Sequence, residues 1–275
     1  MNANAELPIG IFDSGVGGLT VVRQIHRVLP REDLVYLGDT ARVPYGTKSP
    51  GTVVRFACED TRFLVRQRVK AVVVACNTAS AWALPILEQE FDIPVFGVII
   101  PGVQAALRQT QNHRIGVIGT AATIRSQAYS RAILARDGTA KVFVAACPLL
   151  VPLVEEGWTH RKITNAILQT YLSPLLGRRI DTLVLGCTHY PLLKHAIRAV
   201  VGSAVALVDS AESCARFLNE RLQQGDLLSK GRRRAGRIQP FVTDEVERFD
   251  EQARRFLGFP TNPARKVELA AAAAT

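Results

Sequence analysis

The chain has 275 residues, of which 48% are hydrophobic and 21% are charged, and its formal net charge is +10. These values are typical of a folded globular protein with one large or two small domains, and they exclude extensive disorder. The longest apolar run, around Pro94–Leu107, is interrupted by Pro101 and Gly102, so we expect no membrane-spanning helix. The first residues lack the pattern of a signal peptide, which predicts a cytoplasmic location.

The positive charge is widely spread, and one dense basic cluster stands out, at Lys230–Arg237. It lies between a helical pattern and an apolar run, which predicts an exposed loop. A basic protein can bind nucleic acid, but net charge bears on association and not on the chemistry of a site. We therefore expect a solvated surface that attracts a small anionic substrate, and we do not expect nucleic acid or a membrane as a main partner.

Five cysteines occur without a CxxC motif or regular spacing. This pattern indicates neither a disulfide framework nor a zinc site, so we expect free thiols and no metal. The lysines do not fall at a strand end in a way that suggests a pyridoxal phosphate site. The question is then which of the thiols are reactive.

Short apolar runs alternate with longer amphipathic segments, which predicts an α/β protein with mainly parallel sheets. The expected strands are Pro8–Phe12, Leu34–Leu37, Val72–Ala75, Pro94–Val98, Arg114–Ile118, Val142–Ala145, Thr182–Leu185, Val205–Val208 and one near Pro240–Val242. The expected helices are Leu19–Leu29, Pro50–Arg68, Ser80–Glu90, Val103–Gln109, Ile124–Arg136, Lys162–Leu176, Pro191–Val200, Glu212–Gln224 and Val246–Leu257.

Two segments in the first half of the chain are similar to two segments in the second half. Ile9-Gly-Ile-Phe-Asp-Ser-Gly is similar to Ile115-Gly-Val-Ile-Gly-Thr-Ala, and Val72-Val-Val-Ala-Cys-Asn-Thr is similar to Leu183-Val-Leu-Gly-Cys-Thr-His. Because the two offsets are similar, we predict two similar α/β lobes related by a pseudo-twofold, with the active site in the cleft between them. We assign residues 1–97 and 211–262 to the first lobe, 98–210 to the second, and 263–275 to a frayed tail.

Ligands of parallel α/β sheets bind beyond the carboxyl ends of the strands, so the residues directly after the strands are candidates for a site. Cys76 and Cys187 each follow a buried strand and precede a helix, whose N-terminus favours a thiolate. If the two halves face each other, these thiols lie on opposite sides of one cleft. That geometry suits racemisation, in which a base removes the α-proton from one face and an acid returns a proton to the other. Donors to the substrate carboxylate must then stabilise the carbanion-like state.

Five segments, in this order, resemble the glutamate racemase family. They are Gly10-Ile-Phe-Asp-Ser-Gly-Val-Gly-Gly-Leu-Thr20, Tyr36-Leu-Gly-Asp-Thr-Ala-Arg-Val-Pro-Tyr-Gly46, Ala75-Cys-Asn-Thr-Ala79, Cys147-Pro-Leu-Leu-Val-Pro-Leu-Val-Glu-Glu156 and Leu185-Gly-Cys-Thr-His-Tyr-Pro191. The resemblance extends to about Gly258. It implies a cofactor-free isomerase, often a homodimer, that converts L-glutamate to D-glutamate for bacterial peptidoglycan.

The resemblance also implies roles for individual residues. Cys187 takes the proton from L-glutamate, and Cys76 takes it from D-glutamate. Asp13 assists Cys76, although it is also placed to cap a helix, and His189 assists Cys187. Glu155 matches an assisting glutamate, with the adjacent Glu156 as the alternative.

A wider set of residues is expected around the substrate. Those that match the substrate-contacting set of the family are Ser14, Tyr45, Gly46, Asn77, Thr78 and Thr188. Asp13 and His189, which assist the cysteines, are also expected to contact the substrate. Those expected to line the pocket because they follow strands are Asp39, Thr40, Thr120 and Thr123. Hydroxyl, amide and backbone N–H groups of this kind suit the two carboxylates and the ammonium group of glutamate.

Other conspicuous residues receive structural interpretations. The Gly15-Val-Gly-Gly18 stretch fits no nucleotide-binding motif, and we interpret it as a helix start that holds a carboxylate. Cys58, Cys147 and Cys214 are interpreted as core residues, and Trp82 and Trp158 as packing residues.

Two alternatives stay open from the residues alone. The chain could be an aspartate racemase or another member of the same superfamily, because the depth of the pocket is not visible in a sequence. It could also be a bilobal protein that binds an acidic metabolite without changing it, since two α/β lobes suit that role equally well. Such a binding protein does not require the two cysteines.

Overall fold

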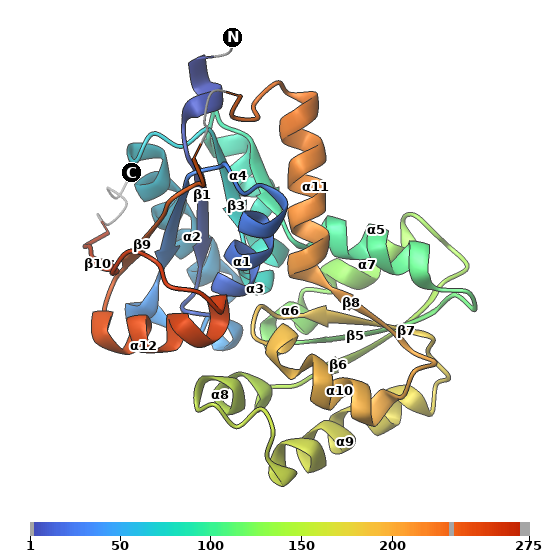
Figure 1. Cartoon of the computed structure of the whole chain (residues 1–275). Coiled ribbons are helices and arrows are strands. Elements are labelled where there is room, and N and C mark those ends of the chain that lie inside the picture. The colour runs from blue at the N-terminus through green and yellow to red at the C-terminus, as the bar shows by residue number, and fades with distance from the viewer. Residues whose placement is uncertain (1–2, 231–233, 270–275) are drawn as a thin grey trace.

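The computed structural model describes residues 3–230 and 234–269. Its strands form two sheets, each the centre of one lobe, and every strand pair within them is parallel (Figure 1). Among the described residues, no helix is both long enough and apolar enough to cross a membrane. The predicted fold class, two α/β lobes with parallel sheets, is confirmed.

The first lobe contains a six-stranded sheet with the order β10-β9-β2-β1-β3-β4. Its strands are β1 (Ile9–Asp13), β2 (Leu34–Gly38), β3 (Ala71–Val74), β4 (Val95–Gly97), β9 (Ile238–Val242) and β10 (Arg265–Lys266). Its helices are η1 (Ala3–Glu6), α1 (Leu19–Val28), η2 (Thr40–Arg42), η3 (Tyr45–Thr47), α2 (Pro50–Arg66), α3 (Asn77–Trp82), α4 (Leu84–Glu90) and α12 (Val246–Leu257).

The second lobe contains a four-stranded sheet with the order β6-β5-β7-β8. Its strands are β5 (Arg114–Gly119), β6 (Lys141–Ala146), β7 (Thr182–Gly186) and β8 (Ala206–Asp209). Its helices are α5 (Ile99–Gln109), α6 (Ala121–Arg125), α7 (Ala128–Leu134), α8 (Leu150–Glu155), α9 (Lys162–Leu176), η4 (Tyr190–Leu193) and α10 (Lys194–Val201). Helix α11 (Ser210–Gln224) leaves β8 and packs against both α1 and α5, so it joins the lobes (Figure 1).

The two lobes repeat one strand order. β2-β1-β3-β4 in the first corresponds to β6-β5-β7-β8 in the second, so β3 and β7 occupy equivalent places. Cys76 follows β3 and Cys187 follows β7. The internal similarity of the sequence thus corresponds to two sheets of the same order, and each sheet delivers one cysteine at the carboxyl end of the equivalent strand.

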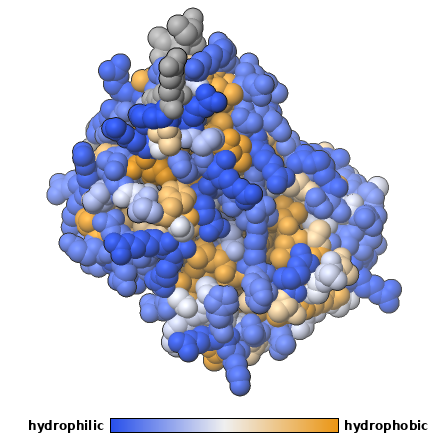
Figure 2. All heavy atoms as spheres, viewed as in Figure 1, coloured by the Kyte–Doolittle hydropathy of each residue, from blue (hydrophilic) through white to orange (hydrophobic). Residues whose placement is uncertain are grey.

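Burial along the strands explains their composition. β1, β2, β3 and β7 are buried along their whole length, because helices cover both sheet faces, and their residues are mostly β-branched or apolar. β6 is an edge strand and is only partly buried, with Val144 exposed. The face of the molecule in Figure 2 is mostly hydrophilic, with apolar residues in scattered patches.

Two expected helices are each divided in two. The segment expected at Ser80–Glu90 begins earlier, at Asn77, and splits into α3 and α4 because Pro85 occupies the first turn of the second helix. The segment expected at Ile124–Arg136 splits into α6 and α7, because Gln127 adopts a left-handed conformation with φ of 54°.

The prediction of a frayed tail from residue 263 onward is wrong for residues 263–269. β10 pairs with β9, Val267 N–H donates to the Val242 carbonyl at 2.8 Å, and Ala264 is buried. An alanine-rich composition close to the end hid a short edge strand, whose stability comes from the sheet and not from its own residues. Residues 270–275 lie outside the described residues. How the rest of the chain divides between the lobes remains a prediction.

Truncation tests the role of β10. A chain ending at Asn262 loses the pairing of β10 with β9 and the hydrogen bond from Ala264 N–H to Asp250 at 3.1 Å. We expect its free energy of unfolding in urea to be about 1–3 kcal/mol lower than that of a chain ending at Leu269, because each buried hydrogen bond contributes about 1 kcal/mol. Equal urea midpoints for the two chains would mean that β10 adds nothing to the first lobe.

Candidate active site

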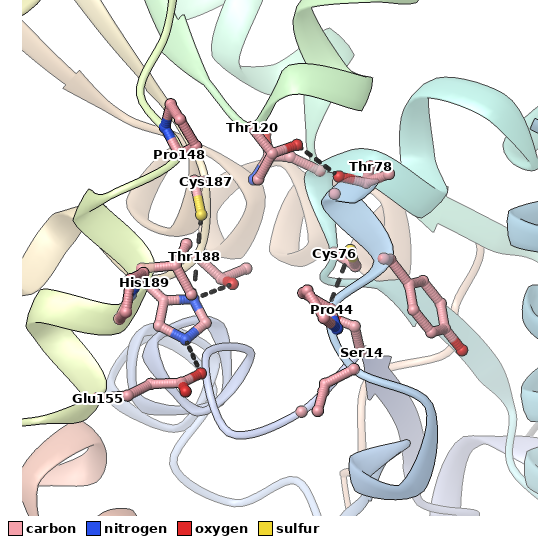
Figure 3. Close-up of a pocket in the computed structure, with 17 residues that line it drawn as sticks. Ser14, Pro44, Cys76, Thr78, Thr120, Pro148, Glu155, Cys187, Thr188 and His189 are labelled. Carbon is pink, nitrogen blue, oxygen red and sulfur yellow. Dashed lines mark hydrogen bonds and ion pairs between the residues drawn. The ribbon is translucent and has the colours of Figure 1, made fainter. Parts of the chain in front are cut away.

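A cavity of about 330 Å³ lies where the carboxyl ends of strands from both lobes meet (Figure 3). Eleven residues predicted for the site line it: Ser14, Tyr45, Gly46, Cys76, Asn77, Thr78, Thr120, Glu155, Cys187, Thr188 and His189. Six lining residues were not predicted, and they are Gly15, Val43, Pro44, Pro148, Val151 and Pro152. The cavity therefore combines a ring of donors and acceptors with an apolar wall of valines and prolines.

The two cysteines lie on opposite sides of this cavity (Figure 3). Cys76 comes from the first lobe and is 6% exposed, and Cys187 comes from the second lobe and is 5% exposed. Each side chain is mostly shielded from bulk water but borders the cavity. A small molecule held between them would present one face to each sulfur.

The surroundings of Cys76 favour its protonated thiol. Burial raises its pKa to about 12, and the charge of Asp13 acts in the same direction. The Ala79 N–H in the first turn of α3 and the Ser14 hydroxyl, 3.9 Å from the sulfur, oppose this shift but do not outweigh it. The start of α3 lowers the pKa of this thiol as expected, but desolvation outweighs it, so the net shift is upward.

Cys187 has a different neighbourhood. It is followed by Thr188 and His189, and then by the short η4 and α10, which together cover the helix expected at Pro191–Val200. The His189 Nδ1 atom lies 3.9 Å from the Cys187 sulfur, and its Nε2 atom lies 2.9 Å from the Glu155 carboxylate (Figure 3). A chain of contacts thus runs from Cys187 through His189 to Glu155 along the cavity wall.

The pKa of His189 is raised in this chain. Burial by itself disfavours the imidazolium, but the hydrogen bonds and charges of Cys187 and Glu155 outweigh it and raise the pKa of His189 to about 10. Burial likewise opposes ionisation of Glu155, but the hydrogen bond from His189 prevails and lowers the pKa of that carboxyl. The edge of the Phe256 ring, 5.5 Å between centroids, supports the imidazole from α12.

Glu155, and not Glu156, faces the cavity. Glu155 ends α8, and its backbone carbonyl accepts hydrogen bonds from Arg255 at 3.0 Å and Gln252 at 3.5 Å, both on α12. Glu156 has a side chain that is 65% exposed and lies 4.0 Å from Arg248. The alternative that the sequence left open is thereby decided in favour of Glu155.

Asp13 lies behind the cavity wall and does not line it. Its carboxylate is fully buried and accepts N–H bonds from Gly18 at 2.9 Å and Gly15 at 3.3 Å, and Thr188 from the second lobe lies 3.5 Å away. Burial raises the pKa of this carboxyl, although His189 and the N–H groups oppose the shift. The glycine-rich loop does hold a carboxylate, but the carboxylate is that of Asp13.

Glycine is required at one point of that loop. A Cβ atom on Gly17 would lie 2.4 Å from both His189 Cε1 and Thr188 Oγ1, so no side chain fits there. The backbone of the first lobe therefore rests directly on the residues that follow Cys187. This contact brings Asp13 and His189 near each other from different lobes.

Three threonine hydroxyls join the lobes at the opposite edge of the cavity. Thr78 on α3 lies 2.9 Å from Thr120 (Figure 3). Thr123 lies 3.0 Å from each of them. Thr120 also caps α6. Thr123 does not line the cavity, so it supports Thr78 and Thr120 from behind.

The predictions for Asp39 and Thr40 are wrong as far as lining is concerned. Thr40 donates to the Asp244 carbonyl at 2.5 Å, and Asp39 accepts from Arg42 at 2.6 Å and from the Tyr45 hydroxyl. The Tyr45 hydroxyl also bonds to Asp60, so it serves this buried network. Tyr45 thus borders the cavity while its hydroxyl is engaged elsewhere, and Asp39 and Thr40 fix the loop that carries it.

The remaining cysteines fit their structural interpretation. Cys58, Cys147 and Cys214 are buried and do not line the cavity. Burial raises the pKa of each of their thiols to about 12. Cys76 has a similarly raised pKa, so what separates these three thiols from it is that they do not border the cavity.

Comparison with known proteins agrees with this site. A family model described as Asp/Glu/Hydantoin racemase matches residues 9–218. A glutamate racemase of Geobacter metallireducens is 52% identical over 263 residues, which cover 96% of this chain and 97% of the relative. The chain belongs to the glutamate racemase family. It is accordingly an amino-acid racemase, an isomerase.

Solved glutamate racemases share the fold over nearly the whole chain. Isoform RacE1 from Bacillus anthracis superposes with a TM-score of 0.93 at 41% identity, covering 96% of this chain and 98% of that one. The enzyme from Francisella tularensis in complex with D-glutamate superposes with a TM-score of 0.88 at 39% identity, with the same coverage of 96% and 98%.

The His189–Glu155 pair makes a pH-dependent prediction for this racemase. In Glu155→Gln the pKa of His189 should fall from about 10 by roughly 1–2 pH units, because one of the two partners that raise it loses its charge. NMR titration of the His189 ring measures this directly. An unchanged titration would show that Cys187 alone raises the pKa of His189.

The same pair contributes to stability in a defined pH range. A raised histidine pKa stabilises the fold fully below its ordinary value of 6.5, and this stabilisation is lost as pH rises through about 10. A lowered glutamate pKa stabilises above its ordinary value of 4.5. The stability difference between the parent and Glu155→Gln should therefore be largest from about pH 4.5 up to the lowered His189 pKa of the variant, and shrink as the pH rises from there through about 10.

Proposed function

We propose that this chain interconverts L-glutamate and D-glutamate without a cofactor, with Cys76 and Cys187 as opposed acid and base. The observation that carries the proposal is the placement of two thiols from two lobes on opposite sides of one cavity. A substrate carbon held between them can lose a proton to one sulfur and gain a proton from the other. The reverse reaction exchanges the two roles, as microscopic reversibility requires.

The two thiols have different neighbours. His189 Nδ1 lies 3.9 Å from the Cys187 sulfur, where it can exchange a proton with it. Cys76, with its pKa raised to about 12 by burial, stays protonated. This asymmetry suits abstraction from L-glutamate by Cys187 and proton delivery by Cys76, which is the assignment that the family resemblance implies.

The cavity also offers anchors for an acidic amino acid. Ser14, Asn77, Thr78 and Thr188 line it with hydroxyl, amide and backbone groups that can bind carboxylates and an ammonium group. Donors to the α-carboxylate stabilise the negative charge that develops when the α-proton leaves. The complex of D-glutamate with the Francisella tularensis relative supports glutamate as the ligand.

The first test is proton exchange at the α-carbon. Purified protein with L-glutamate in D2O and no added cofactor should lose the α-proton NMR signal while the optical rotation decays. Cys76→Ser and Cys187→Ser should each lower the racemisation rate by about 10²–10⁴-fold, because positioned acid–base groups contribute that much. Cys58→Ser, which removes a buried thiol that does not line the cavity, is the matched control and should retain activity.

Two outcomes would replace the proposal. Glutamate that binds but never exchanges its α-proton would favour the bilobal binding protein. Exchange with aspartate and none with glutamate would assign the chain to the other acidic amino acid, so both substrates belong in the assay.

The wider biological role follows from the same family membership. We infer that the D-glutamate serves bacterial peptidoglycan synthesis, that the reaction takes place in the cytoplasm, and that the chain acts as a homodimer. The high identity and coverage of the glutamate racemase relatives support these inferences.

A further inference from the structure

Tyr129 is a buried tyrosine in the second lobe that does not line the cavity. It lies in the first turn of α7, directly after the left-handed turn at Gln127 that separates α6 from α7. Its ring packs among apolar residues of α5 and β7, and Ser210 lies near its hydroxyl. A buried phenol needs a partner for its hydroxyl, and the identity of that partner is what makes Tyr129 informative.

The Tyr129 hydroxyl donates a hydrogen bond of 2.7 Å to the Asn77 side-chain oxygen. Asn77 belongs to the first lobe, directly follows Cys76 and lines the cavity. The other end of the Asn77 amide donates to the Ser210 hydroxyl at 3.5 Å. These two bonds fix which way the amide points, since its oxygen faces Tyr129 and its nitrogen faces Ser210.

Both hydrogen-bond partners of Asn77 also contact the last residues of β7. Ser210 donates to the Leu185 carbonyl at 3.1 Å. The Tyr129 ring packs on Gly186, where an added Cβ would lie 3.1 Å from Cε2. Leu185 and Gly186 are the two residues that precede Cys187.

From this geometry we infer that Tyr129 is a positioning residue that sets the placement of Cys76 relative to Cys187 across the two lobes. Its hydroxyl holds the residue after one cysteine, and its ring supports the residue before the other. Ser210 forms a second connection between Asn77 and the end of β7. The inference rests on the proposed two-thiol racemisation and names the residues that keep its acid and base aligned.

Tyr129→Phe separates the two parts of this role. It removes the bond to Asn77 and keeps the ring against Gly186, so it loosens the Cys76 side of the cavity only. We expect kcat/KM to fall about tenfold, because small misplacements of acid–base groups have effects of this size or more. The fall must be equal for both enantiomers, since the equilibrium constant between them is one.

The specific readout is the deuterium isotope effect at the α-carbon. When proton transfer at Cys76 is slowed, abstraction by Cys76 becomes more rate-limiting in one direction and abstraction by Cys187 less so in the other. With the assignment given above, the isotope effect should rise for D-glutamate and fall for L-glutamate. A purely structural role lowers the amount of folded protein and leaves both isotope effects unchanged.

Two further variants complete the experiment. Ser210→Ala removes the second connection and should shift the isotope effects in the same two directions, which also decides the question if Tyr129→Phe fails to fold. Tyr171→Phe removes a tyrosine hydroxyl elsewhere in the second lobe, where it accepts from Leu149 N–H at 3.5 Å, and should match the parent.

The behaviour of the parent protein distinguishes failure of the proposed function from failure of the positioning role alone. If it exchanges no α-proton of glutamate, the proposed function and the positioning role both fall. If it racemises glutamate, and Tyr129→Phe and Ser210→Ala both keep its kcat/KM and isotope effects, the positioning role alone is overturned.

Discussion

The site depends on one constraint, which is that two lobes carry one cysteine each and must be held at a fixed separation. The cavity they enclose is small, so the lobes contact each other on several sides of it. Gly17 rests on His189, Thr20 donates to the Thr188 carbonyl at 2.8 Å, and Trp82 donates to the Ala122 carbonyl at 3.2 Å. These polar contacts are directional, so they fix the approach of the lobes better than apolar packing alone.

Similar lobes nevertheless create unlike surroundings for their cysteines. β3 and β7 are equivalent strands, but burial and the charge of Asp13 raise the pKa of Cys76, whereas Cys187 has His189 3.9 Å from its sulfur. A histidine in this place can exchange a proton with the thiol, and Cys76 has no such neighbour among the residues that line the cavity. The repeated fold provides the opposed geometry, and differences in the loops after the strands provide the different neighbours.

The sequence predicted those parts of the site that lie directly after strands or within the matched motifs. Cys76, Asn77, Cys187 and Thr188 are of this kind, because a buried strand fixes where the next residues lie. The prediction that Asp39 lines the pocket was wrong, because a strand end does not determine which way the next side chain points. Asp39 instead bonds to Arg42 in a separate network. Position relative to a strand therefore predicts proximity to a site better than contact with it.

Tyr129 shows the other limit of the sequence. It lies well outside the five matched segments, on a helix whose pattern indicates only an amphipathic element, and its importance arises from Asn77, which is distant in the chain. Such a role is created when two lobes close on each other, and no local pattern encodes it. The same holds for α12, which lies between β9 and β10 in the chain and supports both His189 and Glu155. The acid–base groups follow from strand ends, whereas their alignment follows from contacts between segments that only the folded chain brings together.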